Sequence, residues 1–138
     1  MSKVFKNQKS DSKNYNYNTD CTTIEMENFK HPIFCFKHIH KDHNIAKCTD
    51  EEKISLLEQL SNLSQLTWDQ IKDTGRHAIG TEKIDRKSLK VKCPTFITDD
   101  VSYLLAIRFQ GFKPFLIHRN RFIAHIIFID SKFSVYKH

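Results

Sequence analysis

The C-terminal third of the chain, "VSYLLAIRFQGFKPFLIHRNRFIAHIIFIDSKFSVYKH" at residues 101–138, decides the fold class. Apolar runs of strand length alternate there with short polar or glycine-containing turns, a pattern typical of antiparallel strands joined by hairpins. "FIAHIIFI" is apolar on both faces and is therefore expected inside the sheet rather than at its edge. The predicted strands are "YLLAIRF", "FLIHR", "FIAHIIFI" and "FSVYKH", with turns centred on Gly111 and Pro114, near Asn120, and at residues 130–132.

The residues before this meander predict one strand followed by two helices. "HPIFCFKHI" at residues 31–39 is an apolar, aromatic run of strand length. Thr49 with Glu52, and Thr67 with Gln70, match the capping box, in which two residues satisfy each other's free backbone N–H groups. Trp68 is expected to anchor the second helix on the sheet, and Gly75 to end that helix. The apolar stripe of the first helix, which extends to about residue 64, comprises Ile54, Leu56, Leu57, Leu60 and Leu63.

This order of elements predicts an α+β fold: an N-terminal strand, two helices on one face, and a three- to four-stranded antiparallel meander. Residues 1–28 are rich in Asn, Lys, Ser and Asp, and they predict a disordered polar arm. Residues 29–138 have room for one ordinary core, so we expect a single domain. Residues 76–100 have weak periodicity, and the sequence assigns them no element.

Composition narrows the compartment and the class of partner. No apolar run approaches the length of about 18 residues that a membrane span needs, and the N-terminus lacks the apolar stretch of a secretory signal. We therefore expect a cytosolic protein without a membrane partner, whose four cysteines are thiols. Residues 101–138 hold six Lys or Arg against one Asp, whereas residues 50–100 hold eight basic and ten acidic side chains. Such a basic segment attracts polyanions or an acidic protein.

Strand alternation predicts that the reactive side chains of this basic segment share one sheet face. If Phe133 and Val135 point into the core, Tyr136 must lie on the opposite face, where the arginines of the neighbouring hairpin can join it. The predicted catalytic residues are His118, Arg119, Arg121, Tyr136 and His138, and the predicted RNA-binding cations are Arg108, Lys113, Lys132 and Lys137.

These residue types suit cleavage of RNA by its own ribose 2′-hydroxyl. The reaction needs a base for the 2′ proton, an acid for the leaving 5′ oxygen, and cations that hold the charge on the phosphoryl oxygens. Arginine can donate two hydrogen bonds to a phosphate, and histidine titrates near neutral pH. No metal or other cofactor is required for this mechanism.

The order strand–helix–helix–strands, the arginines around "IHRNRF" and the closing "FSVYKH" resemble the RelE/ParE-type toxin superfamily of bacterial toxin–antitoxin systems. The resemblance covers roughly residues 31–138. It implies a RelE-like fold and a toxin that cleaves mRNA on the ribosome under the control of an acidic antitoxin protein. It also implies that Arg119 or Arg121 binds the scissile phosphate, with Tyr136 and His138 near the 2′-hydroxyl or the leaving oxygen. The polar arm and the extra residues 76–100 depart from the family pattern.

Two local motifs leave alternatives open. In "RHAIGTEKI", His77 and Glu82 surround Gly80, and they form either a second acid/base pair or a polar loop. Cys35, His38, His43 and Cys48 have the spacing of a zinc knuckle, which would make the chain a zinc-dependent RNA binder. The competing interpretation places Cys35 in the first strand as a small core residue, with the histidines at an exposed strand end.

A different class of function also fits the basic segment. A non-catalytic regulator of the phage or host-defence type would use the same sheet face to hold RNA or a protein, and its binding would be salt-sensitive without turnover. His125 lies in the most apolar strand, and we expect a core histidine there rather than a catalytic one.

Overall fold

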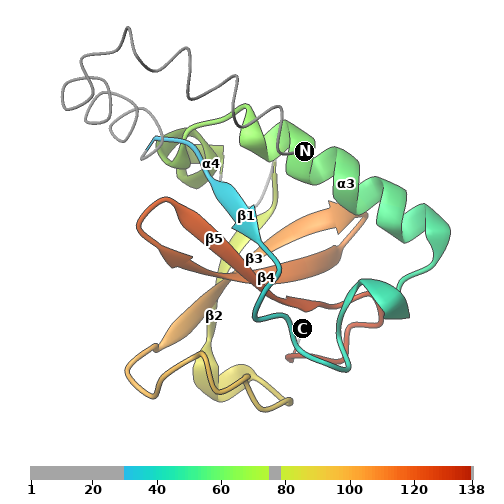
Figure 1. The fold of residues 1–138 in the computed structure, drawn as a ribbon, viewed down its shortest axis with the longest axis vertical. Helices are drawn as coiled ribbons and strands as arrows, with labels where there is room; N and C mark the ends of the chain where they lie inside the picture. The colour runs from blue at the N-terminus through green and yellow to red at the C-terminus, as the bar shows by residue number, and fades with distance from the viewer. Residues whose placement is uncertain (1–29, 75–78, 138) are drawn as a thin grey trace, which may run out of the picture.

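The computed structural model describes residues 30–74 and 79–137, and its centre is a five-stranded sheet (Figure 1). The strand order across the sheet is β1-β5-β4-β3-β2. In chain order the strands are β1 (Ile33–Cys35), β2 (Thr81–Asp85), β3 (Tyr103–Gln110), β4 (Lys113–Asn120) and β5 (Ile123–Ile129). The predicted arm at residues 1–28, His77 and His138 lie outside the described residues.

The sheet is mixed and larger than predicted. β3, β4 and β5 form the expected antiparallel meander. β2, which comes from a segment to which the sequence assigned no element, pairs antiparallel with β3. β1 pairs in parallel with β5, with Phe34 opposite Ala124. The fold is therefore α+β with two helices and a five-stranded mixed sheet, and β5 lies inside it, as its two-sided apolar character predicted.

The two helices begin where the capping boxes predicted. In α3 (Asp50–Ser64), the backbone N–H of Thr49 donates to Oε1 of Glu52 at 2.8 Å, and Oγ1 of Thr49 accepts from the N–H of Glu52 at 3.2 Å. The N–H of Thr67 donates to Oε1 of Gln70 at 2.9 Å before α4 (Trp68–Thr74). These reciprocal bonds satisfy backbone donors that have no partner within the helix.

The buried face of α3 is narrower than the predicted stripe. Leu56, Leu60 and Leu63 are buried at helical spacing, whereas Ile54 is 58% exposed and Leu57 is 70% exposed. The helix buries Glu52 instead of a fourth apolar residue, because the Lys113 ammonium lies 3.0 Å from its carboxylate. The prediction was therefore wrong for Ile54 and Leu57, since spacing alone does not say which side of a broad apolar face meets the sheet.

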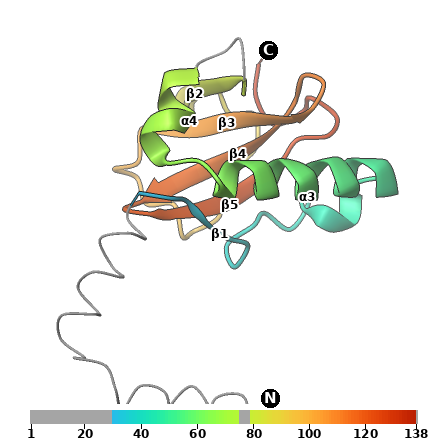
Figure 2. The same cartoon turned by 90° about the horizontal axis from the view of Figure 1, so that it is seen from above.

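Both faces of the sheet are covered, by different kinds of structure. The helices lie together on one face (Figure 2), where Leu63 and Ile71 pack against Phe115 in what we call the helix-side core. On the other face, residues 89–101 and 135–136 pack against Leu116 and Phe128 in the loop-side core. A short 3₁₀-helix, η4 (Arg86–Ser88), opens that covering segment, and the Arg86 guanidinium donates to the carbonyl oxygens of residues 97, 98 and 101.

The predicted last strand is wrong. After β5 the Asp130 carboxylate, which is fully buried, accepts hydrogen bonds from the N–H groups of Ser134 and Val135 at 2.7 and 3.2 Å. This turn bends the chain, with Phe133 at φ 55°, and only an isolated bridge from Tyr136 to Leu89 remains of the expected strand. Val135 and Tyr136 are consequently both buried, whereas Phe133 is 40% exposed, so the expected alternation of faces does not occur.

The first hairpin turn is shorter than predicted. Gly111 and Phe112 form the turn, with Gly111 at φ 58°, and Pro114 already belongs to β4.

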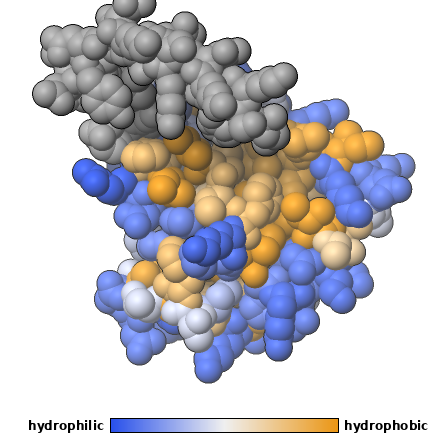
Figure 3. All heavy atoms as spheres, in the orientation of Figure 1, coloured by the Kyte–Doolittle hydropathy of each residue, from blue (hydrophilic) through white to orange (hydrophobic). Residues whose placement is uncertain are grey.

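Apolar residues gather in the middle of the face that Figure 1 presents, with polar residues around them (Figure 3). Among residues 30–74 and 79–137, no helix is long and apolar enough to cross a membrane.

Candidate active site

The predicted catalytic residues do not converge on one sheet face. His118 and Arg119 are neighbours on β4 and therefore point to opposite faces. The His118 ring lies near Phe96 and His125 on the loop side, with ring centroids 6.3 and 6.4 Å apart. Arg119 instead lies over the Trp68 ring on the helix side, 4.2 Å from its centroid. The single Arg/His/Tyr face that the sequence predicted is therefore wrong.

Several other predicted residues are held elsewhere. Arg121 is exposed in the β4–β5 turn at φ 58°, where its carbonyl oxygen accepts from Nε of Arg119 at 2.7 Å. Lys113, predicted to bind RNA, forms the ion pair with Glu52 and donates to Oε1 of Gln110 at 3.2 Å. Lys132 is exposed in the turn after β5 and lines neither of the pockets described below.

Four of the predicted site residues do meet, in a pocket of about 220 Å³ that we call the Arg108 pocket. Glu82 comes from edge strand β2, Arg108 from β3, and Tyr136 and Lys137 from the segment after β5. The sequence had assigned Arg108 and Lys137 to RNA binding, Tyr136 to catalysis, and Glu82 to a possible second acid/base pair. Gly80, Ala106, Phe112 and Pro114 complete the lining.

Two neighbours, Phe112 and Gly80, lie against the Arg108 side chain. Its guanidinium lies over the exposed Phe112 ring, 4.7 Å from the centroid. Its stem passes so close to Gly80 that a Cβ there would lie 2.5 Å from Cδ of Arg108. Gly80 also has φ 75°, a conformation that other L-residues adopt only with strain. The glycine in "RHAIGTEKI" is thus the sequence signal of this site, because only a residue without a side chain leaves room for Arg108.

The Tyr136 hydroxyl keeps its proton in this pocket. Burial, the nearby Glu82 carboxylate and Asp130 raise the pKa of Tyr136 to about 12, and the charge of Arg108 opposes them only in part. Its hydroxyl is therefore protonated at neutral pH. A protonated hydroxyl can donate a hydrogen bond or a proton to an oxygen that gains negative charge.

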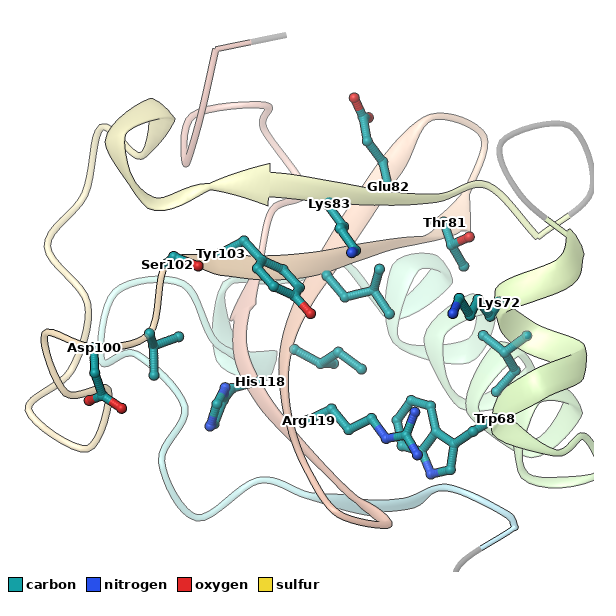
Figure 4. A pocket seen from close by; sticks show the side chains of 14 residues that line it. Trp68, Lys72, Thr81, Glu82, Lys83, Asp100, Ser102, Tyr103, His118 and Arg119 are labelled. Carbon is teal, nitrogen blue, oxygen red and sulfur yellow. The ribbon is translucent and has the colours of Figure 1, made fainter.

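A larger pocket, of about 630 Å³, lies where β3 and β4 separate, and we call it the fork pocket. The described β3–β4 ladder ends at Leu105 and Ile117, although β3 begins at Tyr103 and β4 continues to Asn120. Side chains from four elements surround the opening (Figure 4). They include the labelled residues Trp68, Lys72, Lys83, Tyr103, His118 and Arg119.

The described residues do not assemble the zinc knuckle. Cys48 belongs to the helix-side core, and its thiol donates to the carbonyl oxygen of Asn44. His38 stacks on Phe96, with ring centroids 3.6 Å apart, among the residues that cover the other face. No group of three or more described His, Cys, Asp or Glu side chains is arranged to hold a metal ion. The spacing of the four residues does not produce a site, because Cys48 lies on the helix side of the sheet and His38 on the loop side.

His125 is a buried histidine, as expected, but it is not satisfied. It is 8% exposed, and its Nδ1 has no hydrogen-bond partner among the described residues. Burial, followed by the charges of His38 and His118, lowers the pKa of His125. Burial also lowers the pKa of His118, against a smaller opposing effect of Asp100. Both rings therefore favour the neutral form beside Phe96.

Comparisons with the models of known protein families, with curated proteins and with solved structures gave no match. The RelE/ParE-type relationship consequently stays a prediction.

Proposed function

We propose that this protein is an endoribonuclease that cleaves RNA in the Arg108 pocket by attack of the ribose 2′-hydroxyl. The observation that carries the proposal is the shared lining of one pocket by a carboxylate, an arginine and a protonated tyrosine: Glu82, Arg108 and Tyr136. These are the base, the phosphate-binding cation and the proton donor that the reaction needs. The proposal keeps the chemistry inferred from the sequence but moves it away from Arg119 and Arg121.

In the proposed step, the Glu82 carboxylate accepts the proton of the 2′-hydroxyl while the 2′ oxygen forms a bond to phosphorus. The bond from phosphorus to the 5′ oxygen breaks, and the Tyr136 hydroxyl gives its proton to that leaving oxygen. Arg108 donates hydrogen bonds to the phosphoryl oxygens, and the nearby Lys137 adds positive charge. The products are a 2′,3′-cyclic phosphate and a 5′-hydroxyl, and the proton held by Glu82 returns through solvent to the Tyr136 phenolate.

The test is incubation of the purified full chain with single-stranded RNA, with and without a chelator, followed by analysis of the product ends. Glu82→Gln should lower the cleavage rate about 10²- to 10⁴-fold through loss of the base. Arg108→Ala should lower it about 10²- to 10³-fold, by analogy with loss of one donor to a developing oxyanion. Tyr136→Phe removes the hydroxyl but keeps the buried ring. Lys47→Ala is the control that removes one positive charge elsewhere, since Lys47 is an exposed lysine in η2 (Ile45–Lys47) that lines neither pocket, and it should leave the cleavage rate unchanged.

Cleavage that survives in Glu82→Gln, Arg108→Ala and Tyr136→Phe would overturn the proposal. Binding of RNA that weakens with salt but yields no products would also overturn it, and would favour the non-catalytic regulator.

We also propose the toxin role that the resemblance implied, with an acidic antitoxin as the partner. The net charge of +6 supports an acidic partner. Induction of the intact chain in bacteria should arrest growth and fragment mRNA, whereas induction of folded Arg108→Ala should do neither. Growth arrest by both forms would separate any toxicity from the Arg108 pocket.

A further inference from the structure

We propose that the fork pocket binds one nucleotide unit, a planar base together with its phosphate. This inference goes beyond the cleavage site, because the two pockets are built from different side chains except for Glu82. Figure 4 shows the Glu82 carboxylate pointing past β2, away from the interior of the fork pocket. The Glu82 carboxylate therefore lies on the other side of β2 from the Lys83 ammonium that faces the fork pocket (Figure 4).

The size and floor of the fork pocket suit a compact ring. Its volume of about 630 Å³ lies within the range of roughly 300–1,000 Å³ that small-ligand sites occupy. Its apolar surface comes from Ile71, Leu105 and Ile117. The faces of a nucleobase ring can therefore lose water there without burying a charged side chain of the protein beneath them.

Flat surfaces flank the opening on two sides. The Tyr103 ring extends over the pocket from β3 (Figure 4), and its residue is 46% exposed. Across the opening, the Arg119 guanidinium lies over the buried Trp68 ring, 4.2 Å from its centroid. Nucleobases stack on tyrosine rings and on guanidinium planes, and each base–aromatic stack contributes about 1–3 kcal/mol. These surfaces favour a planar ligand over a branched aliphatic one.

Three cations surround the same opening. Arg119 is positioned over Trp68, and the Lys83 ammonium lies 4.8 Å from the centroid of the Tyr103 ring. The Lys72 side chain reaches the pocket from α4 (Figure 4). Asp100 is the one acid at the opposite rim. A ligand that carries an anionic group at one end of a planar ring matches this distribution of charge, and a nucleoside monophosphate has that form.

The separation of the strands also provides backbone groups that can form hydrogen bonds with a nucleobase. Because the ladder between β3 and β4 ends at Leu105 and Ile117, backbone groups of the two strands beyond that pair do not bond to each other. Backbone N–H and C=O groups must find partners when they lose water. The donor and acceptor edge of a base that enters the fork can supply them.

The test uses the fluorescence of Trp68, the single tryptophan of the chain, together with titration calorimetry on the same samples. The probes are uridine and adenosine 5′-monophosphate, the two nucleosides, inorganic phosphate, and a short single-stranded RNA. We expect saturable binding of the monophosphates that weakens with salt, with much weaker binding of the nucleosides and of phosphate alone. Tyr103→Ala and Lys83→Ala should each weaken binding roughly five- to tenfold. Lys47→Ala, which removes the same charge elsewhere, should change it less than twofold.

The two sources of a nucleotide unit give different results. The RNA is titrated into Arg108→Ala, which should neither cleave it nor hold it in the Arg108 pocket. Much tighter binding of the RNA than of either monophosphate, weakened when Tyr103→Ala is added, identifies a segment of RNA as the ligand. Equal or tighter binding of a monophosphate identifies a free nucleotide. Absence of calorimetric binding by every nucleotide probe overturns the inference, as does binding that inorganic phosphate matches or that Tyr103→Ala leaves unchanged. Cleavage at the Arg108 pocket is measured separately, so failure of one proposal leaves the other standing.

Discussion

Replacement of Gly80 by alanine tests whether the position of Arg108 controls RNA cleavage. Gly80 has φ 75°, and an alanine in that region costs roughly 1–2 kcal/mol. The new Cβ would also lie 2.5 Å from Cδ and 2.9 Å from Cγ of Arg108. Crowding of this kind costs about 1–3 kcal/mol. The free energy of unfolding should therefore fall by about 2–5 kcal/mol, and Arg108 should move by about 1 Å to restore ordinary contact distances.

Gly111→Ala is the matched control for this substitution. Gly111 also has positive φ, at 58°, but a Cβ there would meet nothing within 4 Å. Its alanine variant should lose only the roughly 1–2 kcal/mol of backbone strain. Because both variants carry the backbone strain, the difference in their free energies of unfolding and in their cleavage rates reports the displacement of Arg108 alone.

The assay combines urea unfolding with the initial rate of RNA cleavage, measured where both variants are folded. A misplacement of about 1 Å can lower a rate on the order of 100-fold, so Gly80→Ala should lose most of its activity while Gly111→Ala keeps most of it. Equal cleavage rates in the two folded variants would refute the reasoning, because they would show that the position of Arg108 does not matter.

Three further predictions concern stability. Leu63 is 1% exposed and Leu57, on the same helix, is 70% exposed. Leu63→Ala should therefore lower the free energy of unfolding by about 3–5 kcal/mol, whereas Leu57→Ala should change it by less than about 0.5 kcal/mol. Chemical denaturation of the two variants measures both values. Glu52→Ala should cost about 1–3 kcal/mol, because it removes the acceptor of the Thr49 N–H in the capping box and leaves Lys113 without its carboxylate. Equal stability of variant and parent would contradict this. The hydrogen bond from Thr49 lowers the pKa of Glu52, with Lys113 adding to the effect, so this stabilisation is present at neutral pH and is lost as the pH falls through the lowered value. His125 also loses stability in acid, since burial lowers its pKa and the unfolded chain therefore binds the proton first. Stability should fall as the pH drops below 6.5, and the melting temperature of His125→Leu should decline less steeply with falling pH.

The local elements could be predicted from the sequence because short-range interactions determine them. Thr49 with Glu52 and Thr67 with Gln70 identify the starts of α3 and α4, since a capping box is formed between residues three apart. The apolar runs at residues 103–110 and 123–129 identify two strands, since a strand that is buried on both faces has a nearly continuous run of apolar residues.

The edges of the sheet and the path of the last residues could not be predicted in this way. β2 is weakly patterned, since three of its five residues are charged and exposed (Glu82, Lys83 and Asp85), and pairing with β3 orders it. The bend after β5 depends on the buried Asp130 carboxylate, whose hydrogen bonds to Ser134 and Val135 outweigh the strand propensity of "FSVYKH".

The sequence by itself determined the fold class, the two helix starts, the meander and the residue types of a basic, acid/base-bearing protein. Only the tertiary structure decided which of these residues meet: Arg108, Glu82 and Tyr136 share a pocket, whereas His118 and Arg119 point to opposite faces of β4 and border the fork pocket instead. The physical reason is that alternation sets the face of a side chain only within a regular strand. Where the chain bends or two strands separate, the position of a side chain depends on contacts between residues far apart in the sequence.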